Sequence, residues 1–198
     1  MTYRLKRDIY NLFDLTYQTW TLGQIFAYDL RWRRKALSEF EIKPFELAHK
    51  SQVLDLSLRA WAPVFTAMES AVPHYVYDAF YPQGWQTRQA SDIEAFLDAE
   101  GDRVWVAIKE GVVWGWVGIR FHPEDRMGEI YILAVHPDHQ GRGVGKSLID
   151  FALDRMRAAG MAIAMVETGD DPGHSASRAA YERSGFERWP VARYFREL

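Results

Sequence analysis

The stretch HPDHQGRGVGKSL, residues 136–148, places three glycines within five positions and then continues into Lys146 and Ser147. Glycine-rich loops of this kind let backbone N–H groups approach an anion, and a following helix adds the positive end of its dipole. Two familiar phosphate-binding patterns do not fit. A Walker A loop requires glycine where Gln140 stands, and a dinucleotide fingerprint starting at Gly141 requires glycine where Lys146 stands. The sequence therefore predicts a polyphosphate site, without predicting nucleotide hydrolysis or dinucleotide redox chemistry.

The composition is that of an ordinary globular domain. The chain has 198 residues, of which 48% are hydrophobic and 26% charged. Aromatic residues make up 15%, which fits either an aromatic-lined cavity or simply a bulky core. Cysteine is absent, which excludes disulfides, thiolate metal sites and a cysteine nucleophile. Neither a membrane span nor a signal peptide can be recognised, so we expect a cytoplasmic protein.

Charge is distributed unevenly along the chain. The net charge is −3, so general affinity for nucleic acid is not expected. Residues 1–40 carry seven Lys and Arg against four Asp and Glu, which leaves residues 41–198 with a net charge of −6. This acidity either serves solubility or concentrates a cationic small substrate around the main domain.

The first 38 residues have a pattern of their own. Apolar side chains at Leu5, Ile9, Leu12 and Tyr17 recur at helical spacing, so 1–38 is predicted to be an N-terminal helical extension. A basic amphipathic helix can lie on a membrane or pack on a partner. Here we expect it to fold back on the same domain or on a twin subunit, and therefore predict a homodimer and no membrane partner.

The remaining residues, 39–198, are expected to form one domain that begins with a strand and helices. A capping box at Ser91 and Glu94 predicts a helix start, and Gly101 predicts the end of that helix. Pro63 is expected to kink or divide the preceding helix, which is predicted over residues 50–72. The expected elements are a strand in 40–47, a helix in 50–72, an aromatic, turn-rich segment in 74–86 and a helix in 91–100.

Strands dominate the second half of this domain. The turn signal Lys109-Glu110-Gly111 lies between two apolar runs and predicts a hairpin. Glycines after two later helical segments predict where those helices end. The expected elements are strands in 103–108, 112–120 and 128–135, a helix in 145–160, a buried strand in 161–167, a helix in 175–185 and a last strand in 191–198.

Two segments together resemble the GNAT superfamily of N-acetyltransferases. They are ILAVHPDHQGRGVGKSLIDFAL at 132–153 and AAYERSGF at 179–186, and the resemblance extends over residues 40–198. It implies a mixed α/β fold whose central, mostly antiparallel sheet is flanked by helices and splayed where CoA binds. It also implies an acetyl-CoA-dependent acyltransferase, with 39–198 as the acetyltransferase domain.

The resemblance further implies which residues hold acetyl-CoA. Leu133 and Val135 would offer backbone groups to pantetheine, and an amide near Leu133 or Ala134 would polarise the acetyl carbonyl. His174 stands where many members of the family carry an asparagine that contacts CoA, and a histidine can donate a similar hydrogen bond or shuttle a proton. The pyrophosphate would be held by Gln140, Gly141, Arg142, Gly143, Val144, Gly145, Lys146 and Ser147, mainly through their N–H groups.

Acetyl transfer to an amine requires proton transfer. An alkylammonium has a pKa of roughly 10, so a base must take its proton before attack. Glu129 lies where some members of the family place a catalytic glutamate, and strand alternation would put Glu129, Tyr131 and Leu133 on one face. Tyr181 matches the family's tyrosine, which implies a general acid for the CoA thiolate. The competing interpretations are a glutamate paired with a neighbouring arginine and a tyrosine packed in a helix.

The acceptor is predicted least directly. In this family the segment after the first strand commonly lines the acceptor site, and here it combines aromatic and acidic residues that suit an amine. The candidate acceptor residues are Trp61, Glu69, Tyr75, Asp78, Trp85, Asp170 and Asp171. No metal site is expected, because His136 and His139 do not form a convincing ligand set.

The sequence therefore predicts direct acetyl transfer to a small cationic amine, such as an aminoglycoside antibiotic or a polyamine. A covalent acyl-enzyme is not expected, because there is no cysteine and no Ser-His-Asp arrangement is evident. Acetylation of a protein N-terminus or lysine is the alternative, and a CoA-binding regulatory module with little turnover is the second.

Overall fold

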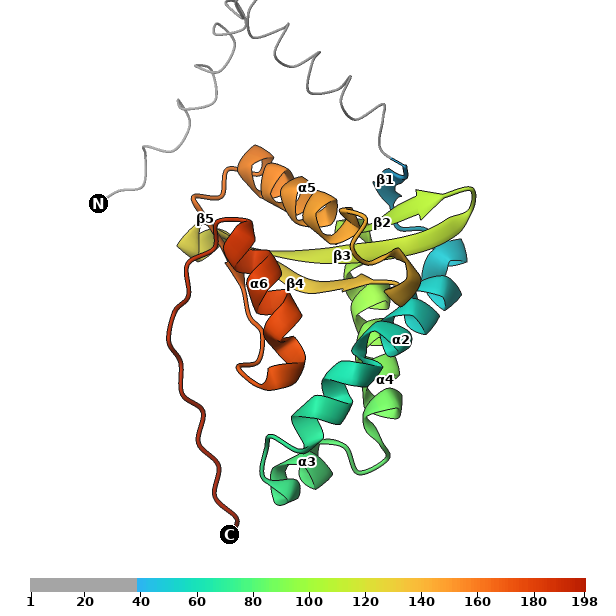
Figure 1. Ribbon diagram of the computed structural model, residues 1–198. Helices are drawn as coiled ribbons and strands as arrows, with labels where there is room; N and C mark the ends of the chain where they lie inside the picture. Colours follow the sequence, from blue (N-terminus) through green and yellow to red (C-terminus); the bar gives the residue numbers. More distant parts are fainter. Residues whose placement is uncertain (1–38) are drawn as a thin grey trace, which may run out of the picture. The chain divides into compact units, whose positions relative to one another are not determined.

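The computed structural model describes residues 39–198, in which five strands form one sheet with the order β1-β2-β3-β4-β5 (Figure 1). Neighbouring strands are antiparallel except β4 and β5, which are parallel. The predicted mixed, mostly antiparallel sheet is therefore confirmed. The predicted extension, residues 1–38, and the dimer contact expected of it lie outside the described residues. The strands are β1 (Glu41–Pro44), β2 (Val104–Lys109), β3 (Val112–His122), β4 (Met127–Val135) and β5 (Ile163–Val166).

Helices cover both faces of this sheet. Figure 1 shows α5 on one side, while α2 and α4 lie on the other. None of the helices within 39–198 combines the length and apolar character needed to cross a membrane. The helices are α2 (Lys50–Glu69), α3 (His74–Phe80), α4 (Trp85–Glu100), α5 (Val144–Ala158) and α6 (Ser175–Arg183). The short 3-10 turns are η1 (Leu47–His49), η2 (Gly101–Arg103), η3 (Pro123–Asp125), η4 (Pro137–His139) and η5 (Pro172–His174).

Two hydrophobic clusters hold these layers together. Strand side chains alternate between the faces, so one set meets α5 and the other meets α2 and α4. The α5-side core includes Val117, Ile119, Ile130, Leu148 and Met156. The α2/α4-side core includes Val53, Leu56, Ile93, Phe96 and Trp116.

One buried polar contact fixes α2 against the sheet. The indole Nε1–H of Trp116 donates to Ser57 Oγ at 2.8 Å, and Ser57 donates in turn to the carbonyl oxygen of Val53 at 2.6 Å. Trp116 and Ser57 are both fully buried. Both polar groups are therefore satisfied without water, as buried polar groups must be.

The predicted helix start at Ser91 is wrong. Helix α4 begins at Trp85, after Gly84 in a positive-φ conformation (φ 84°), and Ser91 lies inside it. The predicted end at Gly101 is confirmed. The aromatic segment after α2 also forms a helix, α3, that the sequence did not predict. Pro82-Gln83-Gly84 separates the two helices, with α3 ending at Phe80 and α4 beginning at Trp85.

The predicted last strand is also wrong, because residues 191–198 form no strand. Alternating apolar residues become a strand only where a neighbouring edge supplies hydrogen bonds. This segment is instead tied by single side-chain contacts. Arg193 pairs with Glu167 at 3.1 Å, and the ring of Phe195 lies 5.8 Å from that of Phe80.

Candidate functional site

The glycine loop ends in an open cradle at the start of α5. Gly141 and Gly143 have positive φ values of 74° and 81°, and a Cβ added to either would meet no atom within 4 Å. Val144, the first helical residue, is fully buried in the α5-side core and so fixes the end of the loop. The first-turn N–H groups of α5 have no partner within the helix and carry the positive end of its dipole. The cradle can therefore accept an anion.

Several predicted loop residues make contacts within the protein. The side-chain amide of Gln140 donates to the carbonyl oxygen of Val135 at 3.1 Å and so ties the loop to the end of β4. Lys146 pairs with Asp150 one helical turn away, at 2.6 Å. The guanidinium carbon of Arg142 lies 5.6 Å from the centre of the Trp114 ring. Backbone groups rather than these side chains thus form the open part of the cradle.

Strand β4 contains a bulge at Tyr131. Gly118 of β3 pairs with Ile132, while its neighbour Ile119 pairs with Ile130, which leaves Tyr131 without an opposite residue. The Tyr131 ring packs on Phe96 of α4 at 4.8 Å. Leu133 packs against the α5-side core instead. The expectation that Glu129, Tyr131 and Leu133 share one face is therefore wrong, because the bulge reverses the alternation.

Strands β4 and β5 separate at this bulge. Their pairing runs from Met127 opposite Ile163 to Ile130 opposite Val166, and β5 ends there. The last part of β4, which includes Leu133, Ala134 and Val135, therefore has no β5 partner. A sheet that opens beside an anion-binding helix start leaves room for a ligand along the strand backbone.

Glu129 lies just before the bulge and is paired with a histidine. Its Oε2 lies 2.9 Å from Nε2 of His122, and only 15% of its side chain is exposed. Its register partner on β3, Arg120, binds Glu100 instead, at 2.8 Å, and lies 3.4 Å from the centre of the Tyr131 ring. Sequence reasoning identified Glu129 but missed His122, because their contact depends on how β3 and β4 are aligned.

Tyr181 projects from α6 toward the α5-side core. Its ring packs edge-on against Phe186, with 5.9 Å between centroids. Burial raises the pKa of the Tyr181 phenol to about 12. The hydroxyl makes no hydrogen bond to the part of the chain that the structure describes. Tyr181 is therefore a protonated phenol throughout the neutral range, with its donor available.

Asp171 and His174 form a closely packed pair before α6. Nδ1 of His174 lies 2.6 Å from one carboxylate oxygen of Asp171, and the other oxygen accepts from the N–H of Gly173 at 2.9 Å. A Cβ on Gly173 would come within 2.6 Å of the Val64 carbonyl oxygen, so this turn lies directly on α2. Asp171 is thus already engaged. Asp170 pairs with Arg188 at 2.6 Å and is likewise engaged.

The predicted acceptor residues on α2, α3 and α4 differ in their surroundings. Trp85 stacks on Phe65 with ring centroids 4.4 Å apart, and Trp61 packs against the α2/α4-side core. Tyr75 is half-buried, while Glu69 and Asp78 are exposed.

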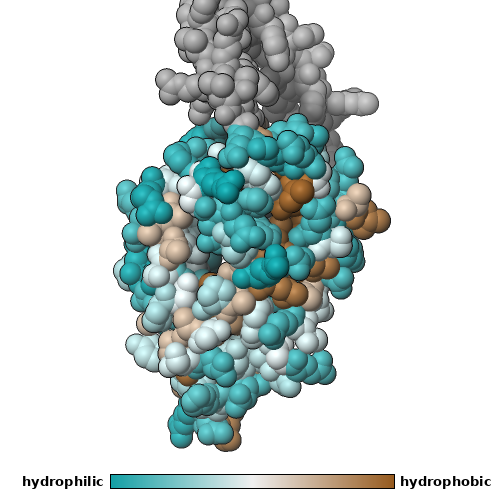
Figure 2. Space-filling view, turned by 45° about the vertical axis from the view of Figure 1, so that its right-hand side comes forward, coloured by the Kyte–Doolittle hydropathy of each residue, from teal (hydrophilic) through white to brown (hydrophobic). Residues whose placement is uncertain are grey.

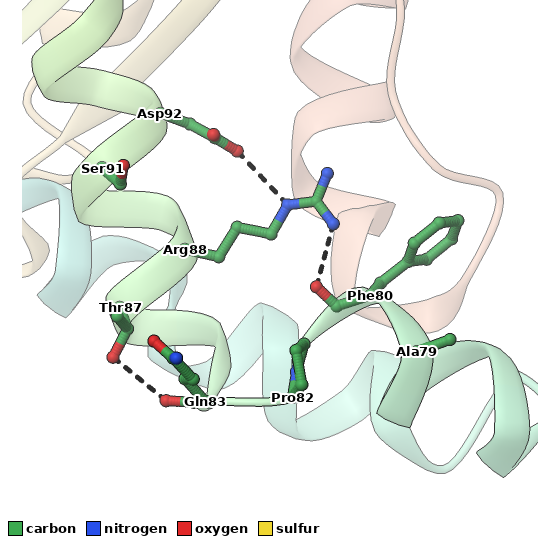
Figure 3. Close-up of a pocket in the computed structure, with 9 residues that line it drawn as sticks. Ala79, Phe80, Pro82, Gln83, Thr87, Arg88, Ser91 and Asp92 are labelled. Atoms are coloured by element: carbon green, nitrogen blue, oxygen red, sulfur yellow. Dashed lines mark hydrogen bonds and ion pairs between the residues drawn. The ribbon is translucent and has the colours of Figure 1, made fainter.

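A cavity of about 380 Å³ lies between α3 and the start of α4 (Figure 3). Within it Arg88 donates to the Phe80 carbonyl oxygen at 2.8 Å and lies 3.5 Å from Asp92. None of the five candidates Trp61, Glu69, Tyr75, Asp78 and Trp85 lines it.

The surface and the arrangement of metal-binding side chains limit which other kinds of site the described residues can form. Figure 2 shows a mostly hydrophilic face on which hydrophobic side chains form small, separated groups, so this face offers no broad apolar docking patch. Among residues 39–198, no group of three or more His, Asp or Glu side chains is placed to hold a metal ion.

Known proteins are similar to this chain in sequence and in fold. The acetyltransferase (GNAT) family profile matches residues 72–186. A mycothiol acetyltransferase of Streptomyces griseus subsp. griseus is 28% identical over 179 residues, covering 88% of this chain and 55% of the relative. The chain thus spans about half the length of that curated relative.

Solved structures agree on the fold. The PaiA N-acetyltransferase from Thermoplasma acidophilum, in complex with coenzyme A, superposes with a TM-score of 0.57 at 13% identity, over 77% of this chain and 92% of that one. An aminoglycoside N-acetyltransferase in complex with CoA gives 0.54 at 19% identity, over 80% and 94%. With a family match over more than half of its residues and this fold, the chain belongs to the acetyltransferase (GNAT) family.

Proposed function

We propose that the chain transfers an acetyl group from acetyl-CoA to a primary amine of a small molecule. The observation that carries this proposal is the separation of β4 from β5 at Tyr131, directly before the open cradle at the start of α5. Family membership gives the class of reaction, and this geometry supports the proposal that acetyl-CoA binds between the end of β4 and the start of α5.

Backbone groups fit the proposed cofactor best. A Cβ at Gly141 or Gly143 would meet no atom within 4 Å, so a ligand has room beside the loop backbone, and the first-turn N–H groups of α5 suit a pyrophosphate. The unpaired end of β4, Leu133 to Val135, suits the amide-bearing arm of CoA, while His174 would approach it from the start of α6. Bound acetyl-CoA supplies an acetyl group activated as a thioester.

Two side chains are proposed to move protons. Glu129 accepts a proton from the ammonium group of the acceptor, directly or through water, because the amine must be neutral to attack. Tyr181 donates a proton to the departing thiolate, since burial keeps the phenol protonated at neutral pH. No covalent intermediate on the protein is needed, as the chain has no cysteine.

A small, cationic acceptor is favoured over a peptide. The relative that covers 88% of the chain is named for the small molecule mycothiol. Asp170 pairs with Arg188, and Asp171 pairs with His174. The exposed Glu69 and Asp78 are therefore the carboxylates proposed to attract a cationic acceptor. The net charge of −6 over residues 41–198 acts in the same direction.

Acceptor-dependent release of CoA thiol tests this proposal. The panel contains aminoglycosides, polyamines, deacetylated mycothiol, free amino acids and short peptides, with acetyl-CoA as donor. Release with one small amine, strongly reduced in Glu129→Gln, is the expected result. Release with peptides alone would replace the small-molecule acceptor by a protein one. Binding of acetyl-CoA without release for any acceptor would favour a CoA-binding module and contradict the enzymatic proposal.

A further inference from the structure

Glu129, the proposed base, pairs with His122, a residue to which acetyl transfer as described above gives no role. The two residues lie near the joined ends of β3 and β4, and Oε2 of Glu129 is 2.9 Å from Nε2 of His122. Glu129 is 15% exposed and His122 32% exposed. The carboxylate therefore lies mostly inside the protein, while the imidazole connects it with solvent.

The charged residues around Glu129 and His122 bind other partners or lie elsewhere. Arg120, which shares a face with both residues, is held by Glu100 and by the ring of Tyr131. On β5 the residue opposite Glu129 is the apolar Met165. On the other face of the sheet, Gly128 packs against Met156 of α5.

The remaining charges near the pair lie in the turn beyond β3 or across the sheet. The η3 turn carries exposed carboxylates at Glu124 and Asp125, followed by the exposed Arg126. Arg103 of η2 lies over Phe121, whose side chain is on the α5 face. Within the described residues, His122 is thus the titratable group in direct contact with Glu129.

We propose that His122 is the proton relay of Glu129, carrying to solvent the proton that the acceptor amine gives up. The inference rests on the proposed function, because it requires Glu129 to act as the base. A carboxylate alone is a poor final acceptor for a proton taken from an amine, and an imidazole can take up a proton at one ring nitrogen and release one to water from the other.

The relay is balanced in protons. The acceptor N–H passes its proton to a carboxylate oxygen of Glu129. In the reacting tautomer Nδ1 of His122 carries the ring N–H and Nε2 is unprotonated, so the resulting carboxylic acid donates from Oε2 to Nε2, which restores the carboxylate and forms an imidazolium. The imidazolium releases the proton on Nδ1 to water, and proton exchange with water returns the ring to its starting tautomer. No bond other than N–H and O–H is made or broken, and His122 acts through Glu129 as a positioning and relay residue.

Histidine substitutions with chemical rescue test the relay. His122→Gln keeps a polar side chain beside Glu129 but cannot carry a proton, and we expect kcat to fall about 100-fold, the lower end for a lost acid–base group. The KM for acetyl-CoA should change less than about twofold, because the cradle is untouched. In His122→Ala, added imidazole should restore kcat in proportion to its concentration. The matched control, His49→Gln, changes a half-buried histidine of η1 and should retain the parental kcat.

Further outcomes separate the relay from the proposed function. In the double variant His122→Gln/Glu129→Gln, kcat should equal that of Glu129→Gln alone, because both changes interrupt one path. The ring ¹⁵N shifts of His122 should change in Glu129→Gln, a readout independent of activity. A parental kcat in His122→Gln, or a loss that imidazole does not rescue, would overturn the relay while leaving acetyl transfer intact. Absence of acetyl transfer in the parent protein would instead contradict the proposed function.

Discussion

The phenol of Tyr181 illustrates how burial sets chemistry at the scale of a residue. Its surroundings favour the neutral form, and its pKa is raised to about 12. A group whose pKa is raised by folding stabilises the fold below its unfolded pKa, and that stabilisation is lost only as the pH rises through the folded pKa. Tyr181 therefore stays protonated, and the fold keeps this contribution, across the whole range in which an enzyme assay is practical.

Tyr181→Phe should lower kcat about 10- to 100-fold with little change in stability, because the hydroxyl lost is a donor without a partner among the described residues. Between about pH 8 and pH 10 the kcat of the parent and that of Tyr181→Phe should depend on pH in the same way, since the phenol does not titrate there. Steady-state rates across this range, with melting curves for both proteins, check the prediction. An alkaline limb near pH 10 that vanishes in the variant would contradict it.

Ser57→Ala should destabilise the protein by about 1–3 kcal/mol, because it leaves the buried indole N–H of Trp116 without an acceptor. Ser70→Ala is the matched control. Its hydroxyl donates to Ala67 in the same way but is exposed, so its loss should cost less than about 0.5 kcal/mol. Urea unfolding followed by tryptophan fluorescence measures both. Equal stabilities for the two variants would show that the Trp116 contact contributes nothing.

Residue types could be predicted from the sequence better than residue contacts. Glu129 and Tyr181 stood out because their chemistry and family positions coincide. His122 did not, since it meets Glu129 only through the register of β3 on β4. Asp171 was expected to face an acceptor, but the turn between β5 and α6 directs it to His174. Pairings of this kind depend on alignment and turn geometry, which short-range patterns do not encode.

At the scale of elements, local signals succeeded where the cause of the structure was local. Lys109-Glu110-Gly111 gives the hairpin of β2 and β3, and Gly160 follows α5 with a φ of 77°. The signals failed where a neighbour decides. Ser91 offers a capping box, yet the helix begins six residues earlier. The bulge at Tyr131 arises where Gly118 lets Phe96 and Ile132 approach, which no pattern within β4 reveals.

Gly143→Ala should weaken acetyl-CoA binding about tenfold. An alanine at φ 81° strains the backbone by about 1–2 kcal/mol, and its methyl group would project into the open cradle. Gly160→Ala is the matched control, with φ 77° and no atom within 4 Å, but it lies beyond the other end of α5. Both variants should lose similar stability, while only Gly143→Ala should bind acetyl-CoA more weakly by calorimetry. Equal binding losses would mean that the cradle does not hold the cofactor.

At the scale of the whole described domain, one sheet separates two cores and serves both. Neighbouring side chains of β3 enter opposite cores, with Trp116 on the α2/α4 side and Val117 on the α5 side. Loss of either core would therefore expose one face of the strands that also hold the other core. The bulge that opens the candidate site lies in β4, which contributes Ile130 to one core and Ala134 to the other.

Leu148→Ala on α5 and Leu56→Ala on α2 should therefore lower the same unfolding transition, although they lie in different cores. Both leucines are fully buried, and each truncation should cost about 2–5 kcal/mol. In a chain of this size the melting temperature would fall by about 5–15 °C. Circular dichroism, which follows the helices, and tryptophan fluorescence, to which Trp105, Trp114 and Trp116 of the sheet contribute, should give one coincident midpoint for each variant. If Leu148→Ala moved only the helical signal, or if the midpoints of the two probes separated, the two cores would unfold independently, and the sheet would not couple the α5 side of the candidate site to the α2/α4 side.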